Sequence, residues 1–162
     1  MNAISHVELK RPIWQAVAML TLGFWLSASL VLSWVIMPSL YVTGMMAQPS
    51  FASAGYAIFW NFNRIELLCA SLVLASVLAL CNTQSTWRLR SIVLSVLLLA
   101  VALVDTYFLT PQMSAIGIQL NIFETVFETP AGMNLLHAGY WVLEAVKLVA
   151  GCMLLSWCNS DQ

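Results

Sequence analysis

Apolar residues fall into four long runs along the chain, and each run is long enough to cross a lipid bilayer. The hydrocarbon core of a bilayer is about 30 Å thick, so a helix needs roughly 20 apolar residues to span it. The pattern predicts transmembrane helices over residues 13–37, 56–81, 89–109 and 134–157. We therefore expect an all-α fold, an integral membrane antiparallel four-helix bundle, with residues 1–162 forming a single transmembrane domain.

Prolines and polar stretches mark the expected ends of these helices. Proline lacks an amide hydrogen and its ring clashes with the preceding turn, so Pro38 is expected to end the first helix and Pro111 the third. Residues 113–128 repeat apolar side chains at helical spacing, with glutamate and glutamine between them. This pattern predicts an amphipathic helix lying on the membrane surface.

The few basic residues predict the orientation. Lys10 and Arg11 precede the first span, and Arg88 and Arg90 lie between the second and third spans. Cytoplasmic segments of membrane proteins carry an excess of lysine and arginine. Both clusters lie on the same side in any four-span arrangement, so we expect both termini to be cytoplasmic. A bacterial inner (plasma) membrane is the simplest location.

The composition supports a membrane protein and excludes one class of partner. Hydrophobic residues make up 61% of the chain and charged residues 8%, whereas soluble domains carry about 25% charged residues. The net charge of −1 gives no electrostatic basis for binding nucleic acid. The lipid bilayer is thus the first expected partner, and a membrane-protein partner or a homo-oligomer is a second possibility.

Charged residues interrupt the apolar runs, at a cost of roughly 2.5 to 3.5 kcal/mol for each charge near the bilayer centre. On the fourth span, positions 137, 140, 144 and 147 fall on one side of a helix. On the first span, a stripe of small or weakly polar residues stepping by four, which includes Trp25, Ser29 and Ser33, is expected to face the other helices. The predicted ligand or ion pocket combines polar residues of spans two, three and four: Asn63, Arg64, Glu66, Asp105, His137, Tyr140, Glu144 and Lys147.

Depth along the predicted spans separates these residues into two levels. Asp105 and His137 are expected near the outer membrane face, because each lies close to one end of its span. The other charged residues are expected deeper, in the outer half of the membrane or at its midplane. We expect Arg64 to pair with Glu144 or Glu66, and Lys147 to pair with the remaining glutamate.

Three interpretations of this pocket stay open: ion pairs that fix helix docking, a proton- or ion-linked site, and a ligand or cofactor pocket. A single histidine can ligate haem or chlorin, so His137 is a candidate ligand. A bis-histidine haem within one subunit is excluded, because His6 precedes the first span and lies toward the opposite face. No metal site is predicted, because no histidine–carboxylate spacing typical of one occurs.

The sequence contains no nucleophile–base pair, phosphate-binding loop or zinc signature, which favours a non-catalytic protein without excluding an enzyme. A non-catalytic accessory or assembly protein is the first hypothesis for its function. A proton- or ion-linked small transporter acting as an oligomer is the alternative. A haem- or chlorin-binding membrane protein using His137 is the second alternative; otherwise no cofactor is predicted.

Four short motifs resemble a family of four-helix membrane domains that includes transmembrane protein 205. They are M-P-S-L (37–40), F-W-N-F-N-R-I-E (59–66), L-T-P-Q-M (109–113) and L-H-A-G (136–139). The resemblance implies a four-helix integral membrane protein without an established enzymatic activity. The stretch around Glu144 and Lys147 departs from the family pattern, so the charged fourth helix is not implied by the resemblance.

Overall fold

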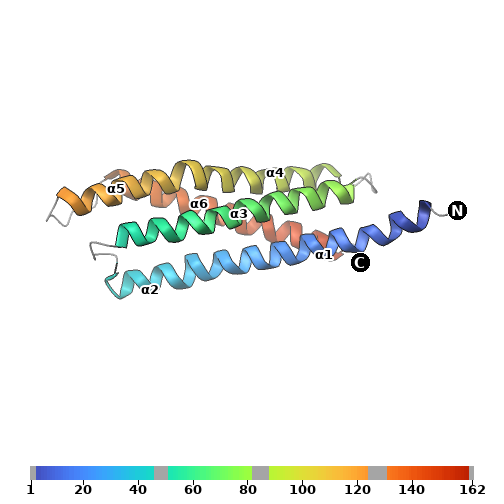
Figure 1. Ribbon diagram of the computed structural model, residues 1–162, viewed down its shortest axis with the longest axis horizontal. Helices are drawn as coiled ribbons and strands as arrows, with labels where there is room; N and C mark the ends of the chain where they lie inside the picture. The colour runs from blue at the N-terminus through green and yellow to red at the C-terminus, as the bar shows by residue number, and fades with distance from the viewer. Residues whose placement is uncertain (1–2, 46–50, 82–87, 124–130, 161–162) are drawn as a thin grey trace.

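The chain folds into four long antiparallel helical rods, shown in the computed structural model in Figure 1. The structure describes residues 3–45, 51–81, 88–123 and 131–160. Within these residues, four helical segments are long and apolar enough to cross a membrane: Ile13–Val42, Ser53–Cys81, Leu89–Ile116 and Asn134–Asn159. The expected all-α fold with four membrane-length helices is confirmed at this level, and such helices indicate a membrane protein.

Two rods are single α-helices and two contain a short π-helical segment. The second rod is α3 (Phe51–Cys81) and the fourth is α6 (Ala131–Ser160). The first rod consists of α1 (Ala3–Leu30), the π-helical turn η1 (Val31–Ile36) and α2 (Met37–Val42). The third consists of α4 (Arg88–Val104), the π-helical turn η3 (Asp105–Leu109) and α5 (Thr110–Phe123).

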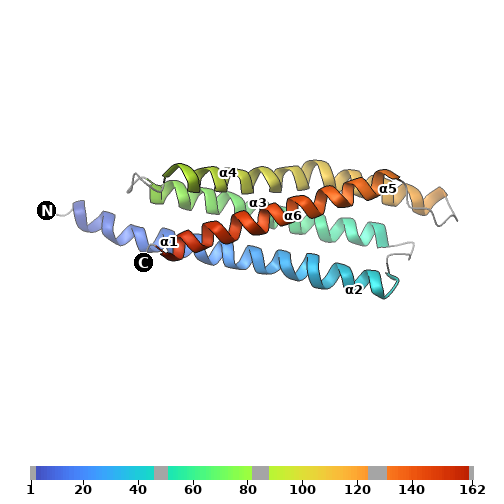
Figure 2. The same cartoon turned by 180° about the vertical axis from the view of Figure 1, so that it is seen from behind.

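The rods form a four-sided bundle in which each packs against two neighbours. α1 contacts α3 and α6, and α4 contacts the same two helices, whereas α1 and α4 lie on one diagonal and α3 and α6 on the other. Figures 1 and 2 show both termini at one end of the bundle. We call this the terminal end, where α3 ends at Cys81 and α4 begins at Arg88. The opposite end, where α2 ends at Val42 and α6 begins at Ala131, is the loop end.

The expectation that Pro38 and Pro111 end their helices is wrong, because both rods continue through the proline. Each proline is the second residue after a π-helical turn. The residue before it donates its amide hydrogen to the carbonyl five positions back: Met37 to Leu32, and Thr110 to Asp105. A π-helical turn adds a residue to the local ladder. The extra room accommodates the proline ring, which would clash within a regular α-helix.

Other helix ends also differ from the predicted boundaries. The first helix begins at Ala3, well before Pro12, and α3 begins at Phe51 rather than at residue 56. The surface helix expected at 113–128 is not a separate element up to residue 123, because α5 continues the third rod directly. Residues 124–130 of that prediction lie outside the described part of the chain.

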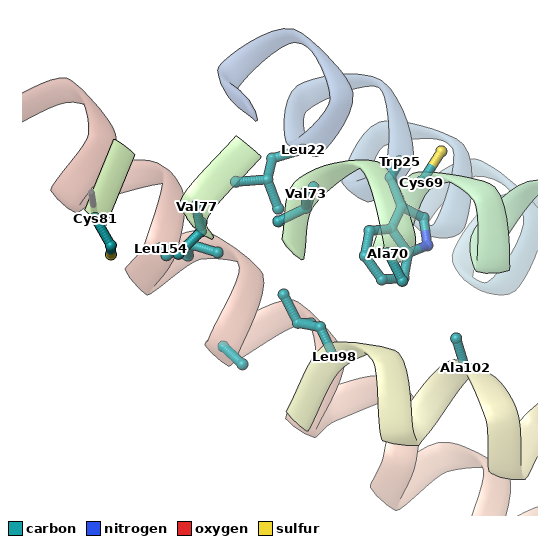
Figure 3. Close-up of a cluster of buried hydrophobic side chains, with 11 residues drawn as sticks. Leu22, Trp25, Cys69, Ala70, Val73, Val77, Cys81, Leu98, Ala102 and Leu154 are labelled. Atoms are coloured by element: carbon teal, nitrogen blue, oxygen red, sulfur yellow. The ribbon is translucent and has the colours of Figure 1, made fainter. Parts of the chain in front are cut away.

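The apolar core occupies the half of the bundle nearer the terminal end. Leu22, Val73, Leu98 and Leu154, one from each rod, have fully buried side chains and meet in this core. Figure 3 shows them converging with the small residues Ala70 and Ala102. The large apolar side chains that remain exposed are distributed over all four rods, as expected for surfaces that face lipid.

Candidate functional site

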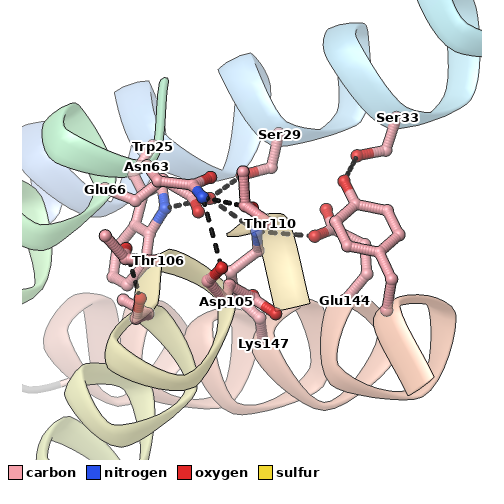
Figure 4. Close-up of polar contacts among 12 residues, drawn as sticks. Trp25, Ser29, Ser33, Asn63, Glu66, Asp105, Thr106, Thr110, Glu144 and Lys147 are labelled. Atoms are coloured by element: carbon pink, nitrogen blue, oxygen red, sulfur yellow. Dashed lines mark hydrogen bonds and ion pairs between the residues drawn. The ribbon is translucent and has the colours of Figure 1, made fainter. Parts of the chain in front are cut away.

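Lys147 lies at the centre of the bundle, between two glutamates (Figure 4). Its Nζ atom is 2.5 Å from Oε1 of Glu66 and 2.6 Å from Oε2 of Glu144. All three residues are at most 2% exposed. Glu144 precedes Lys147 by three residues on α6, so the two share one helix face. Glu66 comes from α3, which lies diagonally opposite α6, so the ion pair crosses the middle of the bundle.

The carboxylate of Glu66 joins three rods. Its Oε1 atom accepts a hydrogen bond from Trp25 Nε1 at 2.9 Å and one from Ser29 Oγ at 3.1 Å, besides that from Lys147. Trp25, Ser29 and Ser33 are each at most 1% exposed. The prediction that their stripe faces the other helices is therefore confirmed, although the sequence did not place these residues in the pocket.

Asp105 provides a third buried carboxylate, and it is bonded differently. The residue is 2% exposed, and neither carboxylate oxygen has a hydrogen-bond partner among the described residues. It lies within electrostatic range of Lys147 and of both glutamates, and Figure 4 shows it beside Lys147. We call Glu66, Asp105, Glu144 and Lys147 the central charge cluster.

Asn63 holds the π-helical turn that begins at Asp105. Its Nδ2 atom donates to Oγ1 of Thr110 at 2.7 Å and, more weakly, to the carbonyl of Asp105 at 3.4 Å. Asn63 and Thr110 are both buried. Asn63 precedes Glu66 by three residues on α3, so both side chains lie on one face of that helix. This face supplies the Glu66 carboxylate and also the Asn63 amide that positions the turn at Asp105.

The central charge cluster lies at the middle of the candidate spans. Glu66 is next to the midpoint of Ser53–Cys81, Asp105 lies just beyond that of Leu89–Ile116, and Glu144 and Lys147 flank that of Asn134–Asn159. The expected position of Asp105 near a span end is therefore wrong. The physical reason is the third rod's continuation past Pro111, which moves its midpoint toward Asp105.

A second polar contact lies beside the cluster, on its loop-end side. The hydroxyl groups of Ser33 and Tyr140 are 2.7 Å apart and share a hydrogen bond. Ser33 belongs to the π-helical turn η1, and Tyr140 lies one helical turn before Glu144 on α6. Tyr140 is half-buried, and its ring packs edge-on against Phe59 of α3.

Arg64 is not part of the cluster, and its predicted pairing with Glu66 or Glu144 is wrong. Its side chain is exposed, and its guanidinium carbon lies 4.3 Å from the centre of the Trp60 ring. Two residues along a helix correspond to about 200° of rotation. Arg64 and Glu66 therefore point in nearly opposite directions. Both glutamates form ion pairs with Lys147 instead.

His137 is exposed near the loop end and is not enclosed with the charges. It shares a helix face with Tyr140, Glu144 and Lys147 as predicted, but the face runs from an exposed end into the core. Within the described part of the chain, no group of three histidine, cysteine, aspartate or glutamate side chains is arranged to hold a metal ion.

The structure thus brings together five of the eight predicted pocket residues closely, with Tyr140 at their edge. The five are Asn63, Glu66, Asp105, Glu144 and Lys147. Sequence reasoning missed Trp25, Ser29, Ser33 and Thr110 as members of the site. The stripe of polar residues at four-residue spacing signalled the first three. A threonine directly before Pro111 gave no comparable signal.

Comparisons with protein-family models, with curated proteins and with solved structures give no match to this chain. The resemblance to the transmembrane protein 205 family therefore stays a prediction. The functional argument rests on the geometry of the site.

Proposed function

We propose that the protein is a proton-linked membrane carrier that works as an oligomer, with the central charge cluster as its proton-binding site. The observation that carries this proposal is Asp105, a carboxylate at the middle of the bundle that is 2% exposed and has no hydrogen-bond partner among the described residues. Buried polar groups in folded proteins are almost always hydrogen-bonded. Ionisable groups within membrane spans commonly belong to ion or proton pathways.

Charge balance supports uptake of a proton. The cluster contains three carboxylates and one ammonium group, so it carries a net charge of −2 when all four are ionised. Lys147 contacts two of the carboxylates, and Asp105 has no direct partner among the residues that the structure describes. Charges in the low-dielectric core of a membrane are costly unless they are compensated. Taking up a proton reduces the net charge without needing any space.

Enclosure restricts the size of the ligand. Every member of the cluster is at most 2% exposed, and the described carboxylates do not form a metal-binding group. A partner helix or a large solute would have to separate the rods to reach these atoms. A proton needs no such separation of the rods, which is why we favour it over other ligands.

The two π-helical turns give independent support. One contains Ser33 and the other begins at Asp105, and both lie at or beside the cluster. Such turns occur rarely and are frequently found at functional sites. A π-helical turn interrupts the regular α-helical hydrogen bonds of the backbone. Here one turn places Ser33, and the other Asp105, toward the same part of the core.

The direction of transport depends on how the chain is inserted. We propose that the terminal end is cytoplasmic and that the membrane is a bacterial inner membrane. Arg88 and Arg90 begin α4 at the terminal end, and α1 enters from the same end with Lys10 and Arg11 before its candidate span. This distribution follows the positive-inside rule. Four spans form a small bundle, so transport of a solute requires an assembly of several copies.

Infrared spectroscopy of the protein in lipid tests for the proton-binding site. The C=O stretching band of a protonated carboxyl group should change in intensity as pH is varied across the physiological range. Asp105→Asn should remove or strongly reduce this change. Glu8→Gln is the matched control, because it makes the same chemical change at a residue before the first candidate span, and it should leave the band unaltered.

A wild-type protein without any titrating carboxyl band would overturn the proposal. An equal band in wild type and Asp105→Asn would show that another carboxyl group takes up the proton. Proton-driven solute uptake by vesicles, lost in Asp105→Asn and retained in Glu8→Gln, then distinguishes a carrier from a protein that only binds protons.

A non-catalytic accessory or assembly protein is the second candidate. The observation in its favour is the set of three donors on Glu66 Oε1, which links α1, α3 and α6, as a purely structural ion pair would. This function predicts subunits that co-purify in stoichiometric amounts and retention of that complex in Asp105→Asn. A visible absorption spectrum of the same preparation, compared with His137→Ala, tests the haem or chlorin alternative.

A further inference from the structure

We propose that the central charge cluster exchanges its proton only with the membrane face at the loop end, through the paired hydroxyl groups of Ser33 and Tyr140. This inference rests on the proposed proton-binding function and adds its sidedness. Its basis is an asymmetry: polar groups extend from the cluster toward the loop end, whereas apolar side chains close the path toward the terminal end.

The polar side chains toward the loop end form a path of increasing burial. His137, Tyr140 and Glu144 lie on one face of α6 at successive turns, and they are exposed, half-buried and buried respectively. The hydroxyl group of Tyr140 contacts that of Ser33 at 2.7 Å. Tyr140 precedes Glu144 by one helical turn on α6, which brings the pair next to this glutamate. The pair therefore stands between the exposed end of α6 and the first carboxylate of the cluster.

The path toward the terminal end is closed by apolar side chains. Val73, Leu98 and Leu154 each lie on the terminal-end side of the cluster residue in their own rod, and Leu22 lies on the terminal-end side of Trp25 in α1. All four are 0% exposed. On the loop-end side of this layer, the Trp25 indole donates a hydrogen bond to Glu66. These four side chains offer a proton no donors or acceptors. Nearer the terminal end, Ser76, Ser91 and Ser95 are also buried, and the hydroxyl groups of Ser76 and Ser95 donate to carbonyls of their own helices.

The titratable groups that face the cluster come from three of the rods. Glu66 and the thiol of Cys69 belong to α3, Asp105 begins η3, and Tyr140, Glu144 and Lys147 belong to α6. The described side chains that the first rod presents are neutral: Trp25, Ser29 and Ser33. No cation other than Lys147 is enclosed with the described carboxylates. A proton arriving from the loop end thus meets a site with an excess of carboxylates.

The transfer balances without a further reactant. A hydroxyl group relays a proton when its oxygen accepts one while its own hydrogen passes to the next acceptor. Tyr140 and Ser33 are therefore unchanged after each complete transfer from water to a carboxylate of the cluster. Release toward the loop end is the reverse of the same steps.

The test uses the full-length protein in sealed vesicles in which its orientation has been determined. The pH is changed on one side at a time, and the carboxyl C=O infrared band is followed. The band should respond to pH at the loop-end face and remain constant when only the terminal-end face is changed. Tyr140→Phe should slow the response to a loop-end pH jump by roughly a hundredfold or more, as expected when a positioned proton-transfer group is lost.

Tyr107→Phe is the matched control, because Tyr107 lies in η3 with its side chain 63% exposed and should keep the wild-type rate. A band that follows pH at the terminal-end face, alone or together with the other face, overturns the sidedness while leaving proton binding intact. An unaltered rate in Tyr140→Phe overturns the role of the hydroxyl pair. A band that responds to neither face overturns the proposed function itself. If Tyr140→Phe does not fold, the sidedness measured in the wild type still decides the inference.

Discussion

The ammonium group of Lys147 shows how much one buried residue determines in this protein. It lies within 2.6 Å of carboxylate oxygens on two different helices and is 1% exposed. Its position explains why two glutamates can remain in the core. Lys147 does not pair directly with Asp105, which has no hydrogen-bond partner in the described part of the chain, and we assign this carboxylate as the group that binds the proton.

Replacing Lys147 by methionine removes the cation and leaves Glu66 and Glu144 uncompensated. Breaking a buried ion pair from one side typically costs about 3 to 5 kcal/mol, and we expect a loss of this size in the free energy of unfolding, measured by denaturant titration in lipid bicelles. The double variant Glu144→Gln with Lys147→Met should recover part of it. Arg64→Gln is the control. Because Arg64 is exposed, this substitution should change the free energy of unfolding little. Wild-type stability in Lys147→Met would contradict the arrangement.

At the scale of elements, the π-helical turn η3 determines where the third rod presents its polar groups. η3 allows the rod to continue through Pro111 and begins at Asp105. The turn is held from outside by Asn63, which bonds to Thr110 and to the Asp105 carbonyl. The geometry of Asp105 therefore depends on α3 as much as on its own helix.

Asn63→Ala should weaken this support. Two hydrogen bonds are lost in a buried place, at about 0.5 to 1.5 kcal/mol each, so unfolding free energy should fall by about 1 to 3 kcal/mol and the Asp105 infrared band should shift. Asn61→Ala is the control on the same helix. The Asn61 side chain is exposed and bonds to the Ala57 carbonyl of its own helix. A larger effect at position 61 than at 63 would refute this account of η3.

At the scale of the whole molecule, close approach of the first and fourth rods shapes the bundle around the cluster. A Cβ atom at Gly151 would lie 2.7 Å from Cδ2 of Leu26, so α6 and α1 pack there because the glycine has no side chain. At the terminal end, Gln15 donates a hydrogen bond to the Cys158 carbonyl at 2.5 Å. These contacts join the first and fourth rods in the apolar half of the bundle, which is nearer the terminal end. The polar half, which contains the proposed path to the cluster, is nearer the loop end.

Gly151→Ala should destabilise the bundle by about 1 to 3 kcal/mol through overpacking against Leu26, measured by the same bicelle titration. Gly23→Ala is the matched control in α1, because a Cβ atom there would have no neighbour within 4 Å. It should be neutral or stabilising by up to about 1 kcal/mol, since alanine favours helix more than glycine does. Equal effects at the two positions would show that the rods are not in close contact at Gly151.

The sequence by itself determined the four helices, because hydropathy and length are local properties that a bilayer-spanning helix must satisfy. It also determined which face of α6 carries His137, Tyr140, Glu144 and Lys147, because helical periodicity fixes the angles between them. The tertiary structure decided which charges meet. Lys147 reaches Glu66 across a diagonal, and Asp105 joins them only through the continued third rod. Such contacts depend on the relative rotation and vertical offset of helices far apart in sequence, which no local pattern specifies.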